Sequence, residues 1–178
     1  MSTILLKNLT SHEGQTLTWA TPALLKRAYE LHAQGDLVGT LRFRSLLDTF
    51  ATAESAAGSW TFKRTGFFAT RITVRAPDSD RDLAVFRHTT WSGGGTLEFA
   101  DGRKFHATTK LWSKRYEFRT ERDELVFAFK ENWWGTTADI AVTAAGWRTP
   151  ELPILLALSW YLVAMAQADG SAAAVSAA

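Results

Sequence analysis

Residues 151–169 read ELPILLALSWYLVAMAQAD, and no charged residue stands between Glu151 and Asp169. As a helix, residues 154–166 would be apolar on all faces, so the segment has no amphipathic stripe. A helix that is apolar all round is buried either in protein or in lipid. The fold therefore depends on which of the two surrounds this segment.

The length and the flanks of this segment favour protein over lipid. Residues 152–168 are seventeen uncharged residues, which as a helix span roughly 25 Å, whereas a hydrocarbon core needs ~30 Å. Only Arg148 precedes the segment closely, and no Lys or Arg follows it, so the usual basic flank of a membrane span is weak. We therefore expect a buried central helix over about 150–168, followed by a mobile tail over 169–178. The alternative is a tail-anchored membrane protein.

The chain before this helix alternates between apolar and polar residues with a period of two from about residue 25 to 143, which predicts strands. The clearest hairpin surrounds Asp101-Gly102. There, Leu97, Phe99, Phe105 and Ala107 are expected to face inward. The same alternation places Leu37 on one face with Leu41 and Phe43, and Leu125 inward with Phe127 and Phe129. Further turns are predicted at 35–36, 57–58, 77–80 and 121–124. Residues 22–33 could instead form a short helix, but the alternation favours a strand.

This pattern amounts to about eleven or twelve short strands in meander order, which is typical of a barrel or a sandwich. We predict a single mainly β domain over 1–178, with a closed antiparallel barrel of about 12 strands over about 17–145. About eight strands is the size at which side chains alone fill a barrel. A wider barrel needs a further filling element, and the apolar C-terminal helix suits that place.

Composition narrows the class of protein. The chain has 178 residues, 46% of them hydrophobic and 21% charged, with a net charge of +2 and no Cys. These values indicate a folded domain and exclude disulfides and a Cys nucleophile. Basic and acidic residues are interspersed, so we do not expect nucleic-acid binding. The first residues lack a basic, apolar leader pattern, and we therefore expect a cytoplasmic protein.

The stretches GTLRFRS, SWTFKR, DGRKFHATT and YEFRT, followed by PELPILLALSWYLV, give the chain a family resemblance. In motif style and element order it resembles the tubby C-terminal-like superfamily, which includes tubby proteins, phospholipid scramblases and LURP-one-related proteins. The resemblance implies a closed barrel wrapped around a hydrophobic C-terminal helix. Tubby proteins bind phosphoinositides through basic residues on the barrel wall. The sequence does not match that site or a scramblase calcium site, so no residue roles are carried over.

No motif indicates catalysis. The sequence SGGG at 92–95 lacks the Gly-Lys-Ser/Thr of a phosphate-binding loop, and no Gly-x-Ser-x-Gly elbow is present. The four histidines, His12, His32, His88 and His106, do not form a local zinc pattern. We therefore expect a non-enzymatic protein without a metal or another cofactor.

The polar residues of most interest are basic. Lys63, Arg71 and Arg75 alternate with apolar neighbours and are expected on the outer face of the barrel, as are Arg42 and Arg44. Such cations could bind the phosphates of anionic lipid at a membrane surface. The alternative, which the pattern favours, is that they are ordinary charges on outward strand positions that serve solubility and edge protection.

Three further alternatives follow from the sequence. Trp133-Trp134 could form an exposed aromatic clamp or pack against the barrel. A protein partner on the outer surface is an alternative to lipid. A third function, a lipocalin-like carrier of a small apolar ligand, would require an empty lumen and so excludes the buried helix.

Overall fold

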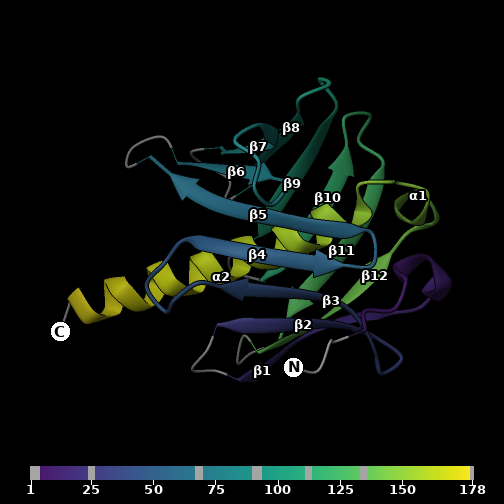
Figure 1. Ribbon diagram of the computed structural model, residues 1–178, viewed down its shortest axis with the longest axis horizontal. Helices are drawn as coiled ribbons and strands as arrows, with labels where there is room; N and C mark the ends of the chain where they lie inside the picture. Colours follow the sequence, from purple (N-terminus) through teal and green to yellow (C-terminus); the bar gives the residue numbers. More distant parts are fainter. Residues whose placement is uncertain are drawn as a thin grey trace.

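The computed structural model describes residues 5–23, 27–66, 70–89, 94–110, 114–132 and 136–176. Twelve strands precede a long C-terminal helix, with a short 3-10 helix at the start and a short α-helix before the long one (Figure 1). In chain order the elements are η1 (Leu9–His12), β1 (Leu17–Ala23), β2 (Ala28–Ala33), β3 (Asp36–Phe43), β4 (Phe50–Ser55), β5 (Gly58–Thr65), β6 (Arg71–Arg75), β7 (Asp82–His88), β8 (Gly95–Phe99), β9 (Lys104–Lys110), β10 (Arg115–Thr120), β11 (Leu125–Glu131), β12 (Thr137–Val142), α1 (Ala144–Trp147) and α2 (Leu152–Ser176).

The strands form a closed antiparallel barrel, which confirms the predicted fold class. Each strand pairs with its neighbours in the chain, and β1 pairs with β12 to close the circle, with Leu17 opposite Ile140. Closure pairs both edges of each described strand with a neighbour. The region 22–33 contains the end of β1 and all of β2, so the strand interpretation is confirmed over its described residues.

The hairpin at Asp101-Gly102 follows its predicted chemistry. Gly102 has a φ of +89°, a left-handed conformation that glycine adopts without strain. The Asp101 carboxylate accepts a hydrogen bond from the Arg103 backbone N–H at 3.1 Å, which holds the turn. Leu97, Phe99, Phe105 and Ala107 are all buried, as predicted.

Two inward positions were predicted one residue too early. Leu37 and Leu125 were expected to face the core, but the fully buried residues are Val38 and Val126. The pairing of β2 with β3 and of β10 with β11 each contains a register shift beside these positions. A β-bulge adds one residue to a strand and so moves the following side chains to the other face.

The C-terminal helix α2 runs through the barrel and fills it (Figure 1). Leu155, Leu156, Leu158, Trp160 and Tyr161 are each 0% exposed. By length and composition this helix could cross a membrane, but 67% of its most apolar window is buried inside the protein. The lumen is therefore occupied, which removes the empty space that a lipocalin-like carrier requires.

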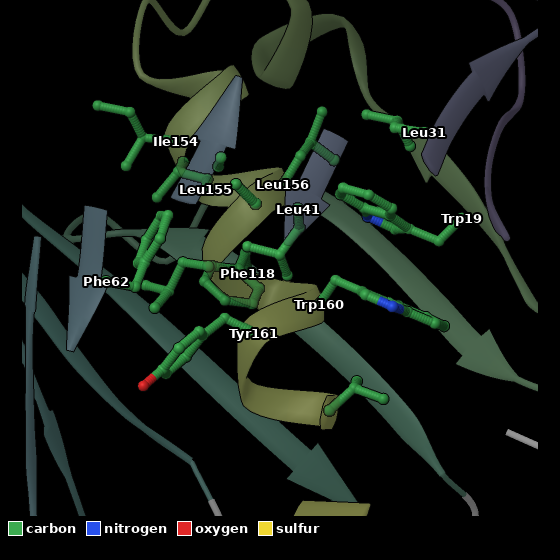
Figure 2. Close-up of a cluster of buried hydrophobic side chains, with 14 of the residues drawn as sticks. Trp19, Leu31, Leu41, Phe62, Phe118, Ile154, Leu155, Leu156, Trp160 and Tyr161 are labelled. Carbon is green, nitrogen blue, oxygen red and sulfur yellow. The ribbon is translucent and has the colours of Figure 1, made fainter. Parts of the chain in front are cut away.

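Aromatic side chains join the helix to the wall. Figure 2 shows Trp160 and Tyr161 leaving α2 on opposite sides. The Trp160 ring stacks on Trp19 with 5.8 Å between the ring centroids, and Tyr161 stacks between Phe43 and Phe62 at 5.4 and 5.5 Å. Stacked pairs of this kind add to the stability gained from burial alone.

Both boundaries of the terminal region differ from expectation. The barrel was predicted to run to about residue 145, but β12 ends at Val142 and the turn of α1 follows, capped by the Thr143 side chain, which accepts from Gly146 N–H. The long helix was expected to end at about residue 168, but α2 continues to Ser176 through Gly170. The alanines that follow Gly170 favour a helix and outweigh the single glycine.

Candidate functional site: the mouth of the barrel

One end of the barrel, which we call the mouth, is where α2 leaves the lumen (Figure 1). Because the strands are antiparallel, the last residues of odd-numbered strands and the first residues of even-numbered strands meet at this end. Asp169 of α2 contacts Arg64 near the end of β5, and Gln167 contacts Glu131 at the end of β11. The opposite end holds the tight hairpin turns and α1.

A cavity of about 240 Å³ lies at the mouth between α2 and the wall. The strand side of its lining is mostly polar, while α2 contributes three apolar side chains and one carboxylate. Its described lining residues are Arg64, Thr70, His88, Thr109, Tyr116, Leu162, Met165, Ala166 and Asp169.

Two charged side chains belong to the described lining, the Arg64 guanidinium and the Asp169 carboxylate. The guanidinium donates two hydrogen bonds to the carboxylate, at 2.6 and 2.9 Å. The Arg64 side chain is 25% exposed and that of Asp169 58% exposed, so the cation is sheltered and its partner faces solvent. These hydrogen bonds raise the pKa of Arg64, which stays charged at any physiological pH.

A second polar cluster at the mouth consists of the Glu131 carboxylate and its two uncharged donors, Tyr116 and Gln167. The Tyr116 hydroxyl donates to Glu131 at 3.1 Å, and the Gln167 amide donates to the other carboxylate oxygen at 2.7 Å. Glu131 is only 6% exposed, so these two bonds satisfy a buried carboxylate. Burial, and then the neighbouring Glu131 carboxylate, raises the pKa of Tyr116. The tyrosine therefore remains a hydrogen-bond donor.

His88 lies at the rim of the cavity. Its ring packs edge-on against Phe86 at 5.0 Å, and although the residue as a whole is exposed, its imidazole is partly desolvated. This desolvation lowers the pKa of His88, and the nearby Arg64 guanidinium lowers it further. Near pH 7 the imidazole is therefore neutral.

The predicted outward cations fall into two groups. Lys63 on β5 lies opposite Thr73, with Arg71 and Arg75 two residues to either side of Thr73 on β6, so these three cations are neighbours on the outer wall. Arg75 forms an ion pair with Asp82 at 2.6 Å and is thus neutralised. Within the described part of the chain, neither Lys63 nor Arg71 forms an ion pair with a carboxylate; Arg71 donates to the Thr65 hydroxyl at 3.3 Å.

The remaining predicted cations lie on and just after β3. Arg42 is exposed and faces outward, opposite Thr52. Arg44 follows the strand, lies above the Phe50 ring at 5.5 Å and pairs with Asp48 at 2.6 Å. The structure thus brings Lys63 and Arg71 together and places Arg42 and Arg44 two strands away.

Arg87 was not singled out from the sequence, although it belongs to the same group. It lies directly opposite Arg71 on β7, and its side chain is 60% exposed. Two like charges directly opposite each other on neighbouring strands are unfavourable unless an anionic group compensates them. Glu98 forms an ion pair with Arg87 at 3.3 Å, while no carboxylate among the described residues pairs with Arg71. The alternation of Arg87 with the buried Phe86 could have identified this residue.

The turn between β3 and β4 presents two leucines to solvent at the mouth. Leu46 is 55% exposed and Leu47 is 97% exposed. This turn is held in place, because Arg27 donates to the carbonyl oxygens of Leu46 and Asp48 at 3.1 and 2.9 Å. The Asp48 carboxylate also accepts from the Phe50 backbone N–H at 2.9 Å, the main cause of its lowered pKa. Sequence periodicity does not report such a side-chain–backbone anchor.

The other sequence candidates do not converge. His12 lies 3.6 Å from Asp36, His32 lies 3.0 Å from Glu30, and His106 bonds Thr96 at 3.1 Å. Over the described residues, no group of three or more His, Asp or Glu side chains is arranged to hold a metal ion. Ser92 and Gly93 of the SGGG segment and the pair Trp133-Trp134 lie outside the described residues.

Comparison with known proteins supports the fold. No protein-family model matches the sequence, and no curated protein matches it significantly. An X-ray structure of the Arabidopsis thaliana protein AT5G01750 is similar, with a TM-score of 0.53 and 11% sequence identity. The match covers 84% of this chain and 90% of that one. At this identity the likeness extends to the fold alone.

Proposed function

We propose that this protein is a non-enzymatic binding domain that docks on anionic membrane surfaces through the mouth of its barrel. The observation that carries the proposal is the anchored turn with Leu47, a residue that is 97% exposed. A large apolar side chain held out by hydrogen bonds is ready to enter an apolar phase without first being ordered. Placement in the tubby C-terminal-like superfamily is part of this proposal, supported by the barrel, its central helix and the likeness in fold.

Cations lie on the same end of the molecule as the leucines. Lys63, Arg71 and Arg87 face outward from the mouth-proximal parts of β5, β6 and β7, and Arg44 precedes Leu46 in the anchored turn. Arg87 is paired with Glu98 and Arg44 with Asp48, both on the exposed surface, so Lys63 and Arg71 supply most of the net positive charge. Apolar residues flanked by Lys and Arg are the combination that binds the interface of an anionic bilayer. This charge pattern favours a lipid surface over a neutral protein partner.

The expected affinity follows from general magnitudes. A Lys or Arg near an anionic surface contributes about 1 kcal/mol, and each leucine that leaves water contributes ~1.5–3 kcal/mol if fully buried. The three wall cations and two leucines together give reversible, salt-sensitive binding. Loss of the three cations should weaken binding by more than about tenfold.

The test is co-sedimentation with vesicles of phosphatidylcholine alone or mixed with phosphatidylserine. We expect binding only to the mixed vesicles, and less of it at high salt. The triple variant Lys63→Gln, Arg71→Gln and Arg87→Gln and the double variant Leu46→Ser and Leu47→Ser should each bind at least about tenfold more weakly.

A matched control removes the same charge from the opposite end of the barrel. Arg81, Arg122 and Arg148 are exposed there, and their joint replacement by Gln should leave vesicle binding unchanged. Equal losses in both triple variants would show only a net-charge effect and would contradict docking through the mouth. A wild-type protein that ignores anionic vesicles would overturn the proposal.

A further inference from the structure

We propose that the mouth cavity binds the oxyanion head group of a small amphiphile, a carboxylate or phosphate on an apolar chain, with Arg64 as its anchor. The cavity is distinct from the outer wall, because Arg64 is directed inward against α2 whereas Lys63 and Thr65 beside it face outward. The inference therefore goes beyond membrane docking and does not depend on it.

The charge of the cavity defines the head group. The Arg64 side chain lies between the barrel wall and α2 and is only 25% exposed. Because less water surrounds the guanidinium there, its attraction for an anion is stronger than at the surface. A guanidinium offers paired N–H donors that match a carboxylate or a phosphate. Thr109 and His88 add a hydroxyl and an imidazole to the same lining. The buried carboxylate of Glu131 is not part of the described lining and is already satisfied by its two donors.

The apolar side of the cavity accounts for the chain of the ligand. Leu162, Met165, Ala166 and Asp169 are spaced three and four residues apart, so they lie on one face of α2. The three apolar side chains therefore lie on the same face of α2 as Asp169, whose carboxylate is hydrogen-bonded to Arg64. A volume of about 240 Å³ is smaller than the ~300–1,000 Å³ of pockets for drug-sized ligands. It suits a head group and the first carbons of a chain.

Asp169 already shows how such a ligand would bind. Its carboxylate makes two hydrogen bonds to Arg64 from a position that is 58% exposed. An external carboxylate could replace it while Asp169 turns to solvent, so that one oxyanion exchanges for another. The helix carboxylate is thus a competitor of the ligand, and its removal should strengthen binding.

The experiment titrates the full-length protein with sodium hexanoate and follows the Arg64 side-chain N–H and the His88 ring by NMR. We expect millimolar binding of hexanoate and at least about tenfold weaker binding of both 1-hexanol and inorganic phosphate. Hexanol lacks the charge, and phosphate lacks the chain. If inorganic phosphate bound as tightly as hexanoate, the proposal that the ligand needs an apolar chain would be contradicted.

Two variants test the anchor and the competitor separately. Arg64→Gln should abolish hexanoate binding, whereas Asp169→Asn should strengthen it about two- to fivefold, the range expected for release of an exposed ion pair. Unchanged binding in Asp169→Asn, or no response of the wild type at millimolar hexanoate, would overturn the inference. The wall variant Lys63→Gln, Arg71→Gln and Arg87→Gln should keep wild-type hexanoate affinity, so failure of membrane docking and failure of this site are distinguishable.

Discussion

Replacement of Leu156 by Asp tests most severely whether α2 is the core of the barrel. Leu156 is 0% exposed, and truncation of such a residue to Ala costs about 2–5 kcal/mol. An Asp at the same place loses a similar apolar contact and adds an unpaired buried carboxylate, which costs several kcal/mol more. The sum reaches the ~5–15 kcal/mol stability of a typical domain. We therefore expect Leu156→Asp to be unfolded or insoluble, and Leu156→Ala to be folded with lowered stability.

Urea unfolding followed by fluorescence of the eight tryptophans measures this loss. The matched control is Leu47→Asp, the same substitution at a residue that is 97% exposed, which should change stability by less than about 0.5 kcal/mol. A Leu156→Asp protein that remains soluble with the wild-type unfolding midpoint would refute the buried-helix account.

Three further outcomes follow from individual contacts. Gly95→Ala should destabilise the barrel, because an added Cβ would lie 2.4 Å from the Phe86 ring; a normal thermal midpoint would contradict this close packing. Tyr161→Phe removes a hydrogen bond of 2.5 Å to the Thr49 carbonyl and should cost ~0.5–1.5 kcal/mol in urea unfolding, while an equal stability would show the bond to be dispensable. Burial lowers the pKa of His88, so the unfolded chain binds the proton more tightly and stability should fall slightly as pH drops below ~6.5. A His88→Gln variant should lose that part of the pH dependence, and an identical pH profile would contradict it.

The barrel could be predicted because the patterns that specify its strands and turns involve residues close together in the chain. The alternation around Asp101-Gly102 depends on residues adjacent in the chain, and both the turn and its inward side chains are as predicted. The bulges that place Val38 and Val126 in the core depend instead on pairing between strands. A period of two does not reveal them, since one inserted residue leaves the apolar content of a strand unchanged.

The cavity could not be predicted for a related reason. Arg64 and Asp169 are separated by 105 residues and meet only because α2 passes through the barrel and leaves it beside β5. In the sequence, Asp169 with Gly170 looks like the end of a helix, yet α2 continues past it. The outward cations, in contrast, were accessible from alternation, and Arg87 shares that pattern with Lys63 and Arg71.

The most direct test of the membrane account uses the absence of cysteine from the chain. A single cysteine is introduced as Leu47→Cys at the mouth, or as Arg122→Cys at the opposite end, and labelled with a polarity-sensitive fluorophore. On addition of vesicles that contain phosphatidylserine, we predict a blue-shifted emission for the label at position 47 and no shift for the label at position 122. No shift at position 47, or equal shifts at both positions, would contradict docking through the mouth of the barrel.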